Sequence, residues 1–233
     1  MKTVTLADVR VELSLDDLAT RLHVRAGSAQ YPELAQLVED AAKAARPKAI
    51  GGIAYVDERG DDFVVIDGVR FDSRVLAVNL AQTGRVFPFV ATSGLELDIW
   101  ADGMDDFLYR YWSEAIREAA LRAAIAAIND WVDDSFRPGK TARMNPGSLA
   151  DWPIQQQLPL FRLLGDVEGA TGVRLTDGLL MVPSKSVSGI RYGTGDSFES
   201  CMLCPREACP NRRAPYDPEL YAKRYGPTAA AKG

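Results

Sequence analysis

The sequence has few of the residues on which many metal and nucleophilic sites are built. Its 233 residues include one histidine, His23, and three cysteines, all between residues 201 and 209. A single histidine excludes a His-rich zinc site or a two-histidine iron site built by this chain alone. It also leaves any Ser-His-Asp or Cys-His pair dependent on His23. That residue falls on a predicted amphipathic helix, where we interpret it as a packing or surface histidine.

The chain also lacks an excess of positive charge and a long apolar run. Its 27 Lys and Arg residues against 32 Asp and Glu residues give a formal net charge of −5. This balance argues against general nucleic-acid binding, which needs a basic face to neutralise phosphates. The most apolar window, 119–128, contains Arg122 and is too short to span a bilayer. Residues 1–15 have no apolar core of signal-peptide length. We therefore expect a cytoplasmic protein that binds neither nucleic acid nor a membrane.

Helical and β-prone segments are intermixed along the chain. Capping residues at Ser14 and at Asp72 or Ser73 predict two helix starts. Helical apolar spacing predicts further helices over 31–45 and 105–133, and another runs from the Asp151 cap to Gly165. Strands are predicted over 53–56, 63–66, 86–90, 173–175, 179–182 and 187–192, with Pro88 favouring an edge position.

Regular βαβ alternation, GxGxxG and GxxxxGK[ST] are all absent from this sequence, which leaves the common nucleotide-binding folds without support. We predict an α+β fold, with a mainly antiparallel twisted sheet and flanking helices. The length allows one or two domains.

The three cysteines form a CxxCxxxxC motif, in which proline follows Cys204 and Cys209. A CxxC turn lets two thiolates converge on one metal, and the longer spacing can bring in a third. Three thiolates can hold a 4Fe–4S cluster with one open iron, or zinc with a fourth ligand from elsewhere. We interpret Cys201, Cys204 and Cys209 as such ligands; the alternative is three free thiols, or an adventitious disulfide, on a loosely packed tail that begins at Gly193. Three arginines would partly offset the thiolate charge: Arg206, Arg212 and Arg213.

A second set of motifs spans residues 143–192. Arg143 precedes an Asn145-Pro146-Gly147 turn, which offers a guanidinium fork and exposed backbone groups suited to a carboxylate and a ribose or adenine edge. Taken alone, this pattern is better interpreted as a plain turn between helices. Further motifs are Gly172-Val173-Arg174-Leu175-Thr176, Met181-Val182-Pro183-Ser184-Lys185-Ser186-Val187-Ser188-Gly189 and, on the long predicted helix, Ser113-Glu114-Ala115-Ile116-Arg117-Glu118.

Together these motifs resemble the activation (reactivation) domain of cobalamin-dependent methionine synthase, and more closely its small standalone homologues. That family has an Arg-x-x-Pro-Gly-Tyr-type loop, a Gly-Val-x-Leu-Thr strand, a Met-x-Pro-x-x-Ser-x-Ser-Gly segment and a helical Ala-Glu-Ala-Phe-x-Glu. The resemblance covers about residues 90–192 and is faint over residues 1–90. Ser148 replaces the family's tyrosine, and the family's N-terminal ligand-binding aspartate has no clear counterpart. The standalone relatives carry a similar cysteine motif.

The resemblance implies an activation-domain-like unit over residues 1–192, followed by a cysteine-containing tail over 193–233. It also implies S-adenosylmethionine binding. Arg143 would hold the methionine carboxylate, Glu114 would contact the ligand, and the backbone at Asn145 and Gly147 would read the adenosine. No catalytic residue is expected on this chain, so reductive methylation of cobalamin would require a partner that holds the corrinoid.

Two functions remain open from the sequence. One is a reactivation module for a corrinoid protein or cobalamin-dependent methyltransferase, binding S-adenosylmethionine and relaying an electron through an iron–sulfur cluster. The other is a non-catalytic adaptor that docks on a corrinoid protein, with zinc or an iron–sulfur cluster as a structural element.

Overall fold

A computed structural model describes residues 1–209 and 212–226; Pro210 of the cysteine motif and residues 227–233 of the predicted tail lie outside the described residues. The strands are β1 (Lys2–Leu6), β2 (Lys48–Arg59), β3 (Phe63–Ile66), β4 (Val69–Asp72), β5 (Arg85–Thr92), β6 (Thr141–Met144), β7 (Arg174–Leu175), β8 (Met181–Val182) and β9 (Ser186–Gly193). The α-helices are α1 (Leu15–Arg21), α2 (Gln30–Ala44), α3 (Arg74–Asn79), α4 (Leu95–Asp102), α5 (Phe107–Phe136), α6 (Gln157–Leu164) and α7 (Val167–Thr171). Short helical turns are η1 (Ile154–Gln156), η2 (Ser200–Leu203) and η3 (Tyr221–Tyr225).

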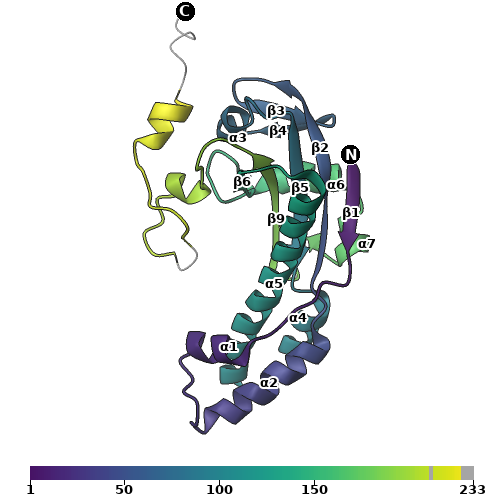
Figure 1. The fold of residues 1–233 in the computed structure, drawn as a ribbon, viewed down its shortest axis with the longest axis vertical. Coiled ribbons are helices and arrows are strands. Elements are labelled where there is room, and N and C mark those ends of the chain that lie inside the picture. The colour runs from purple at the N-terminus through teal and green to yellow at the C-terminus, as the bar shows by residue number, and fades with distance from the viewer. Residues whose placement is uncertain (210–211, 227–233) are drawn as a thin grey trace, which may run out of the picture.

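The main sheet has the strand order β4-β3-β2-β5-β9-β6, and β1 pairs with β2 outside this path. Every pairing in it is antiparallel. Strands β7 and β8 form a separate two-stranded sheet. The predicted α+β class with an antiparallel sheet and flanking helices is therefore confirmed (Figure 1).

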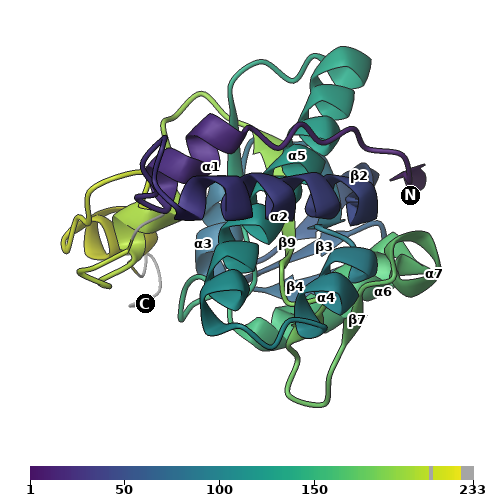
Figure 2. The same ribbon diagram turned by 90° about the horizontal axis from the view of Figure 1, so that it is seen from below.

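The sheet lies between two layers of helix. Along β5, Val86 and Val90 belong to a core shared with α3, α6 and α7, whereas Phe87 and Phe89 pack toward α5. This alternation is the period-two pattern of a strand that is buried on both faces. Helix α5 covers one face of the sheet, and α6 and α7 lie on the opposite side (Figures 1 and 2).

A second apolar core lies below the sheet. The first half of α5 packs there against α1, α2 and α4, with Trp112, Ile116 and Leu34 almost completely buried. Helix α5 thus packs into this core with its first half and against the sheet with its second half, and Figure 1 shows it running from the lower helices to the sheet. Among the described residues, no helix combines the length and apolarity needed to cross a membrane.

Several local predictions are confirmed by capping contacts. Ser14 caps α1 by accepting a hydrogen bond from the Asp17 N–H, and Ser73 caps α3 through the Leu76 N–H. These hydroxyl groups satisfy N–H groups that have no partner inside the helix. Asp151 caps a different helix from the one predicted, because its carboxylate accepts from Ser73 and from the Val75 N–H at the start of α3.

The predicted edge position of Pro88 is wrong. Strand β5 is central, between β2 and β9. Its pairing with β2 runs through Gly51–Phe89 and resumes at Ala54–Val86, so Pro88 has no paired residue on its β2 side, whereas on the other side it stands opposite Ile190 of β9. A missing N–H costs little on the β2 side, because no ladder hydrogen bond is formed there.

The prediction of a loosely packed tail is also wrong for several described residues. Phe198 and Tyr225 are buried in the core that the sheet shares with α3, α6 and α7, with relative exposures of 4% and 0%. The Tyr225 hydroxyl donates to Asn79 Oδ1 over 2.9 Å, and the Arg74 guanidinium donates to the carbonyl groups of Tyr225 and Gly226. Aromatic burial and these contacts fix the tail against α3.

Candidate functional site

Arg143 lies on β6, the last strand of the sheet. Its neighbours Ala142 and Met144 are buried in the core on the α6 side, so alternation along the strand directs Arg143 to the α5 side. Arg143 stands directly opposite Arg191 of β9. Two like charges at facing strand positions repel each other, and each requires an anionic partner.

The two arginines differ in whether they form an ion pair. The Arg191 guanidinium forms an ion pair with Asp133 of α5 over 2.7 Å and donates to the Asn129 carbonyl. Arg143 is half-buried, forms no ion pair with any described carboxylate, and has a buried Nε without a hydrogen-bond partner among the described residues. Burial lowers the pKa of the Arg143 guanidinium, the charges of Arg213 and Arg191 lower it further, and the nearby charge of Glu199 opposes them. Arg143 is therefore a partly buried cation that forms no direct ion pair among the described residues.

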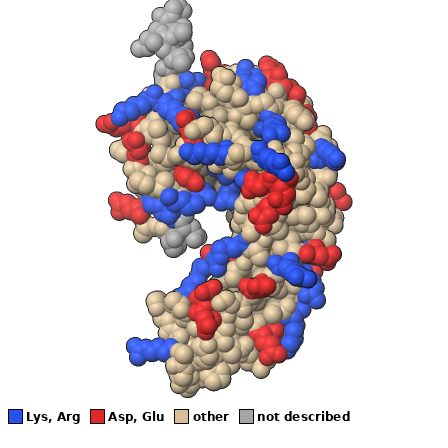
Figure 3. All heavy atoms as spheres, viewed as in Figure 1, with Lys and Arg blue, Asp and Glu red and all other residues tan. Residues whose placement is uncertain are grey.

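Arg143 faces a groove of about 1100 Å³ between α5, α1, β9 and the tail. Figure 3 shows the notch between the tail and the lower helices, with Lys and Arg side chains on both of its sides. An apolar wall is formed by Leu121 and Ile125 of α5 and by Val187 of β9. Six cationic side chains line the groove, which we call the basic groove: Arg21, Arg122, Arg143, Lys185, Arg212 and Arg213.

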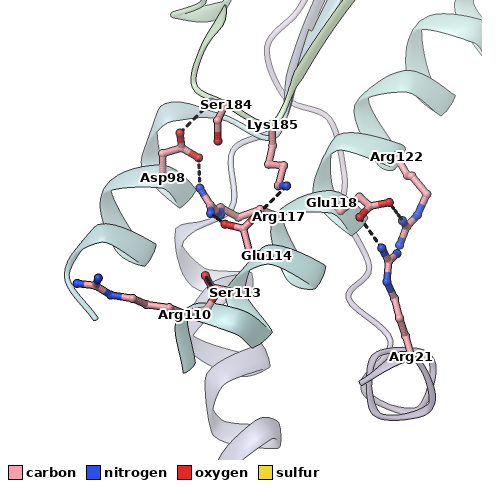
Figure 4. Close-up of polar contacts among 10 residues, drawn as sticks. All are labelled: Arg21, Asp98, Arg110, Ser113, Glu114, Arg117, Glu118, Arg122, Ser184 and Lys185. Atoms are coloured by element: carbon pink, nitrogen blue, oxygen red, sulfur yellow. Dashed lines mark hydrogen bonds and ion pairs between the residues drawn. The ribbon is translucent and has the colours of Figure 1, made fainter. Parts of the chain in front are cut away.

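Glu114 lies beside the basic groove and is already engaged. Its carboxylate forms ion pairs with Arg117 and with Lys185, the latter over 2.7 Å (Figure 4). Arg117 also pairs with Asp98 over 2.8 Å. Glu114 therefore positions Lys185 at the groove in this structure, and a ligand would have to compete with two cations for its carboxylate.

Asn145 and Gly147 shape the turn after β6 and do not line the basic groove. The Asn145 amide donates to the Ser188 carbonyl over 2.7 Å, and its own carbonyl accepts from the Ser148 N–H and hydroxyl. The Gly147 N–H donates to the Trp152 carbonyl over 2.8 Å. Gly147 has a φ of 83°, which glycine adopts without the strain of a side chain.

The three cysteines take up different surroundings. Cys201 lines the basic groove, Cys204 packs against the core that the sheet shares with α3, α6 and α7, and Cys209 lies at the edge of the described segment. All three are free thiols. The Arg212 guanidinium holds the loop together by donating to the carbonyl oxygens of Cys201 and Cys204 over 3.1 and 3.3 Å.

This arrangement does not fit a three-thiolate ligand set. Within the part of the chain that the structure describes, no three His, Cys, Asp or Glu side chains are grouped to hold a metal ion. Burial raises the pKa of the Cys201 thiol, but hydrogen bonds from the Arg213 and Ala214 N–H groups and the charge of Arg213 outweigh it and lower that pKa. The thiolate of Cys201 is thus stabilised by protein groups.

The fold is similar to that of a known protein domain. A crystal structure of the MetH reactivation domain bound to AdoHcy matches it with a TM-score of 0.60, covering 85% of this chain and 80% of that one. The two sequences are 17% identical, so this likeness concerns the fold. No family model matches the chain, and no curated protein matches its sequence.

The sequence motifs named Arg143 as a candidate ligand-binding residue but did not indicate most of the other residues that line the basic groove. Lys185 was visible only as part of the motif around Ser186, and Arg213 only as a countercharge for the cysteines. Their convergence depends on the pairing of β9 with β5 and β6 and on the path of the tail, which no local pattern encodes. Glu118, which pairs with both Arg21 and Arg122, was visible only as the last residue of the helical motif.

Proposed function

We propose that this chain is a reactivation-type module that binds S-adenosylmethionine beside Arg143 and acts on a corrinoid held by a partner protein. The observation that carries the proposal is the half-buried Arg143 guanidinium, which has no anionic partner among the described residues and faces the basic groove. The similar fold of the MetH reactivation domain, which was crystallised with AdoHcy, supports it.

Each predicted site residue has a role in this proposal. Arg143 pairs with the methionine carboxylate through its guanidinium fork. Glu114 acts through Lys185 and is a positioning residue. Asn145 and Gly147 keep the turn in place after β6, so they support Arg143 by holding the backbone. When bound, S-adenosylmethionine supplies the methyl group for a reduced corrinoid on the partner.

The finer parts of the proposal concern the setting of the chain. We place it in the cytoplasm, as a relative of the activation domain, with residues 1–192 as the ligand-binding unit and 193–233 as a segment that follows it. No step passes through the three cysteines, because the described residues do not group them as ligands. If the anaerobically purified protein contained about four iron and four sulfide ions per chain, the cysteine-containing loop would have to rearrange around a cluster.

Calorimetry with S-adenosylmethionine tests the proposal. Replacing Arg143 by alanine should weaken binding roughly 10- to 150-fold, because a charged hydrogen-bond partner is lost. Arg143→Lys should restore binding only in part, since lysine keeps the charge and loses the fork. Arg70→Ala, on the opposite edge of the sheet, is the control. Equal binding by wild type and Arg143→Ala would contradict the proposal.

A second function, the non-catalytic adaptor, is favoured by one observation. Glu114 is held by Arg117 and Lys185, and the Gly147 N–H is committed to Trp152. Fewer polar groups are then free for a small ligand than the sequence motifs imply. An adaptor would bind a purified cobalamin-binding protein in sedimentation experiments with equal affinity in the presence and absence of S-adenosylmethionine. A reactivation module should bind it more tightly in one of those two states.

A further inference from the structure

The basic groove holds more positive charge than one carboxylate ligand would balance. Four of its six cations pair with three carboxylates: Lys185 pairs with Glu114, Arg213 pairs with Glu199, and Arg21 and Arg122 share Glu118. The whole chain, by contrast, has a net charge of −5. The groove therefore carries a local excess of positive charge on a chain whose net charge is negative.

The excess charge is greatest where the tail meets β6. Arg143 has no carboxylate partner among the described residues, and the hydrogen bonds of Arg212 go to uncharged carbonyl groups. Arg213 pairs with Glu199, and both line a smaller pocket together with Arg143, Arg191 and Asp133. Guanidinium groups from β6 and the tail thus converge on one region. Such a group of forks matches the geometry of phosphate oxygens.

The opposite wall of the groove is apolar. Leu121 and Ile125 lie one helical turn apart on α5, and Val187 of β9 adjoins them. A volume of about 1100 Å³ is large enough for a ligand of nucleotide size, since small-molecule pockets are commonly about 300–1,000 Å³. Charge at one end and an apolar wall beside it suit a ligand with a flat organic body and several phosphate oxygens.

We propose that the basic groove binds a phosphate-bearing organic ligand of the nucleoside di- or triphosphate class. Its phosphates lie against Arg143, Arg212 and Arg213, and its base lies along Leu121 and Ile125. S-adenosylmethionine, which has one carboxylate and a cationic sulfonium, leaves this excess of positive charge unbalanced. The inference does not depend on S-adenosylmethionine binding, although both ligands would use Arg143.

Calorimetry at low salt with ATP, inorganic pyrophosphate and adenosine tests the proposal. ATP should bind more tightly than pyrophosphate, which lacks the base, and than adenosine, which lacks the phosphates. The affinity for ATP should fall as salt rises, because the contact is electrostatic. No binding of ATP, or equal binding of ATP and adenosine, would overturn the proposal. If affinity for single-stranded DNA increased with its length and exceeded that for ATP, the groove would be a polyanion surface instead.

Matched arginine variants locate the site. Arg122→Gln in the groove should weaken ATP binding about 3- to 10-fold. Arg70→Gln is its control, because both side chains are 53% exposed and each pairs with one carboxylate. An equal loss in Arg70→Gln would overturn the assignment.

Arg213→Gln should weaken ATP binding at least as much as Arg122→Gln, provided that the thermal unfolding of the Arg213→Gln variant is unchanged. If the tail detaches in that variant, Lys185→Gln takes its place.

The two ligand proposals can fail separately. Arg143→Ala should weaken both ATP and S-adenosylmethionine, whereas Arg122→Gln should weaken ATP alone. Weaker ATP binding with S-adenosylmethionine binding retained in Arg122→Gln would support a contribution to ATP binding from groove cations other than Arg143. Binding of S-adenosylmethionine without any binding of ATP would overturn this inference and leave the proposed function in place.

Discussion

Gly189 allows strand β9 to pass close to the chain that leads from Arg143 into its turn. A Cβ atom at this position would lie 2.7 Å from the Met144 carbonyl oxygen and 2.5 Å from the Asn145 amide nitrogen. The side-chain amide can move, but the backbone carbonyl of a paired strand cannot do so without disturbing the sheet. The glycine is required here by close approach, since its φ is not in the left-handed region.

We expect Gly189→Ala to destabilise the protein by about 1–3 kcal/mol, the cost typical of overpacking in a well-packed interior. Urea unfolding measures this change. Gly178→Ala is the control, because a Cβ there would meet only Thr176 Oγ1 at 3.9 Å. A stability loss in Gly178→Ala as large as that in Gly189→Ala would show that the effect comes from the glycine backbone and not from the contact with Met144.

At the residue scale, the motifs single out Arg143 but not its surroundings, and ligand binding by Arg143 stays a prediction. An arginine before an Asn-Pro-Gly turn is visible in the sequence, and the structure places it where a ligand can approach. Glu114 was expected to meet the ligand, yet it pairs with Arg117 three residues further along α5. Whether a neighbouring side chain or a ligand binds the Glu114 carboxylate depends on three-dimensional geometry, which the sequence motif does not specify.

At the scale of elements, the docking of η3 makes the tail part of the core. Tyr225 is fully buried, packs edge-to-face with Phe198 and bonds Asn79. The charged and glycine-rich composition around Tyr225 predicted a loosely packed segment. Composition describes a whole stretch of residues, so it does not reveal that one aromatic side chain is buried in the core. Helices with a cap and an apolar period, such as α1 and α3, were predictable because both signals are local.

We expect Tyr225→Ala to lower the free energy of unfolding by about 3 kcal/mol, the order of cost for emptying a buried aromatic site. The matched control is Tyr221→Ala on the same turn, where the ring is 44% exposed. Urea unfolding followed by circular dichroism measures both variants. If the two variants were equally stable, the tail would not contribute its aromatic anchor to the core.

The same residue predicts a pH dependence. Burial raises the pKa of Tyr225 to about 12, above the ordinary value of about 10. Because the folded state favours the protonated phenol, its contribution to stability is complete below about pH 10 and is lost as pH rises toward about 12. Wild type should therefore lose stability relative to Tyr225→Phe over that interval. Parallel loss in both proteins, measured by urea midpoints at several pH values, would contradict this assignment.

At the scale of the whole molecule, α5 joins two apolar cores. Its first half packs on α1, α2 and α4, and its second half packs on the sheet through Ala124, Ile128 and Val132. A helix that unfolds at one end loses hydrogen bonds and packing that support the other end. The two cores should therefore unfold together.

Leu34→Ala tests this coupling. Leu34 is fully buried in the lower core, and its truncation should cost about 2–5 kcal/mol. Hydrogen exchange in β5, in the other core, should speed up by the same factor as exchange in α2. Leu180→Ala, where the side chain is 67% exposed, should leave both rates unchanged. Faster exchange in α2 alone would show that the lower helices open independently.

The pairing of β5 with β9 sets a constraint on how the molecule folds. Residues 93–185 separate these two neighbouring strands of the sheet, so the pairing closes a very long loop, and such contacts form slowly. Until β9 arrives, β5 offers an open hydrogen-bonding edge to other chains. Arg143, Lys185 and Arg213 come together only after this closure. During synthesis, the basic groove is therefore among the last parts of the protein to exist, and a chain that stalls before β9 exposes a surface prone to aggregation.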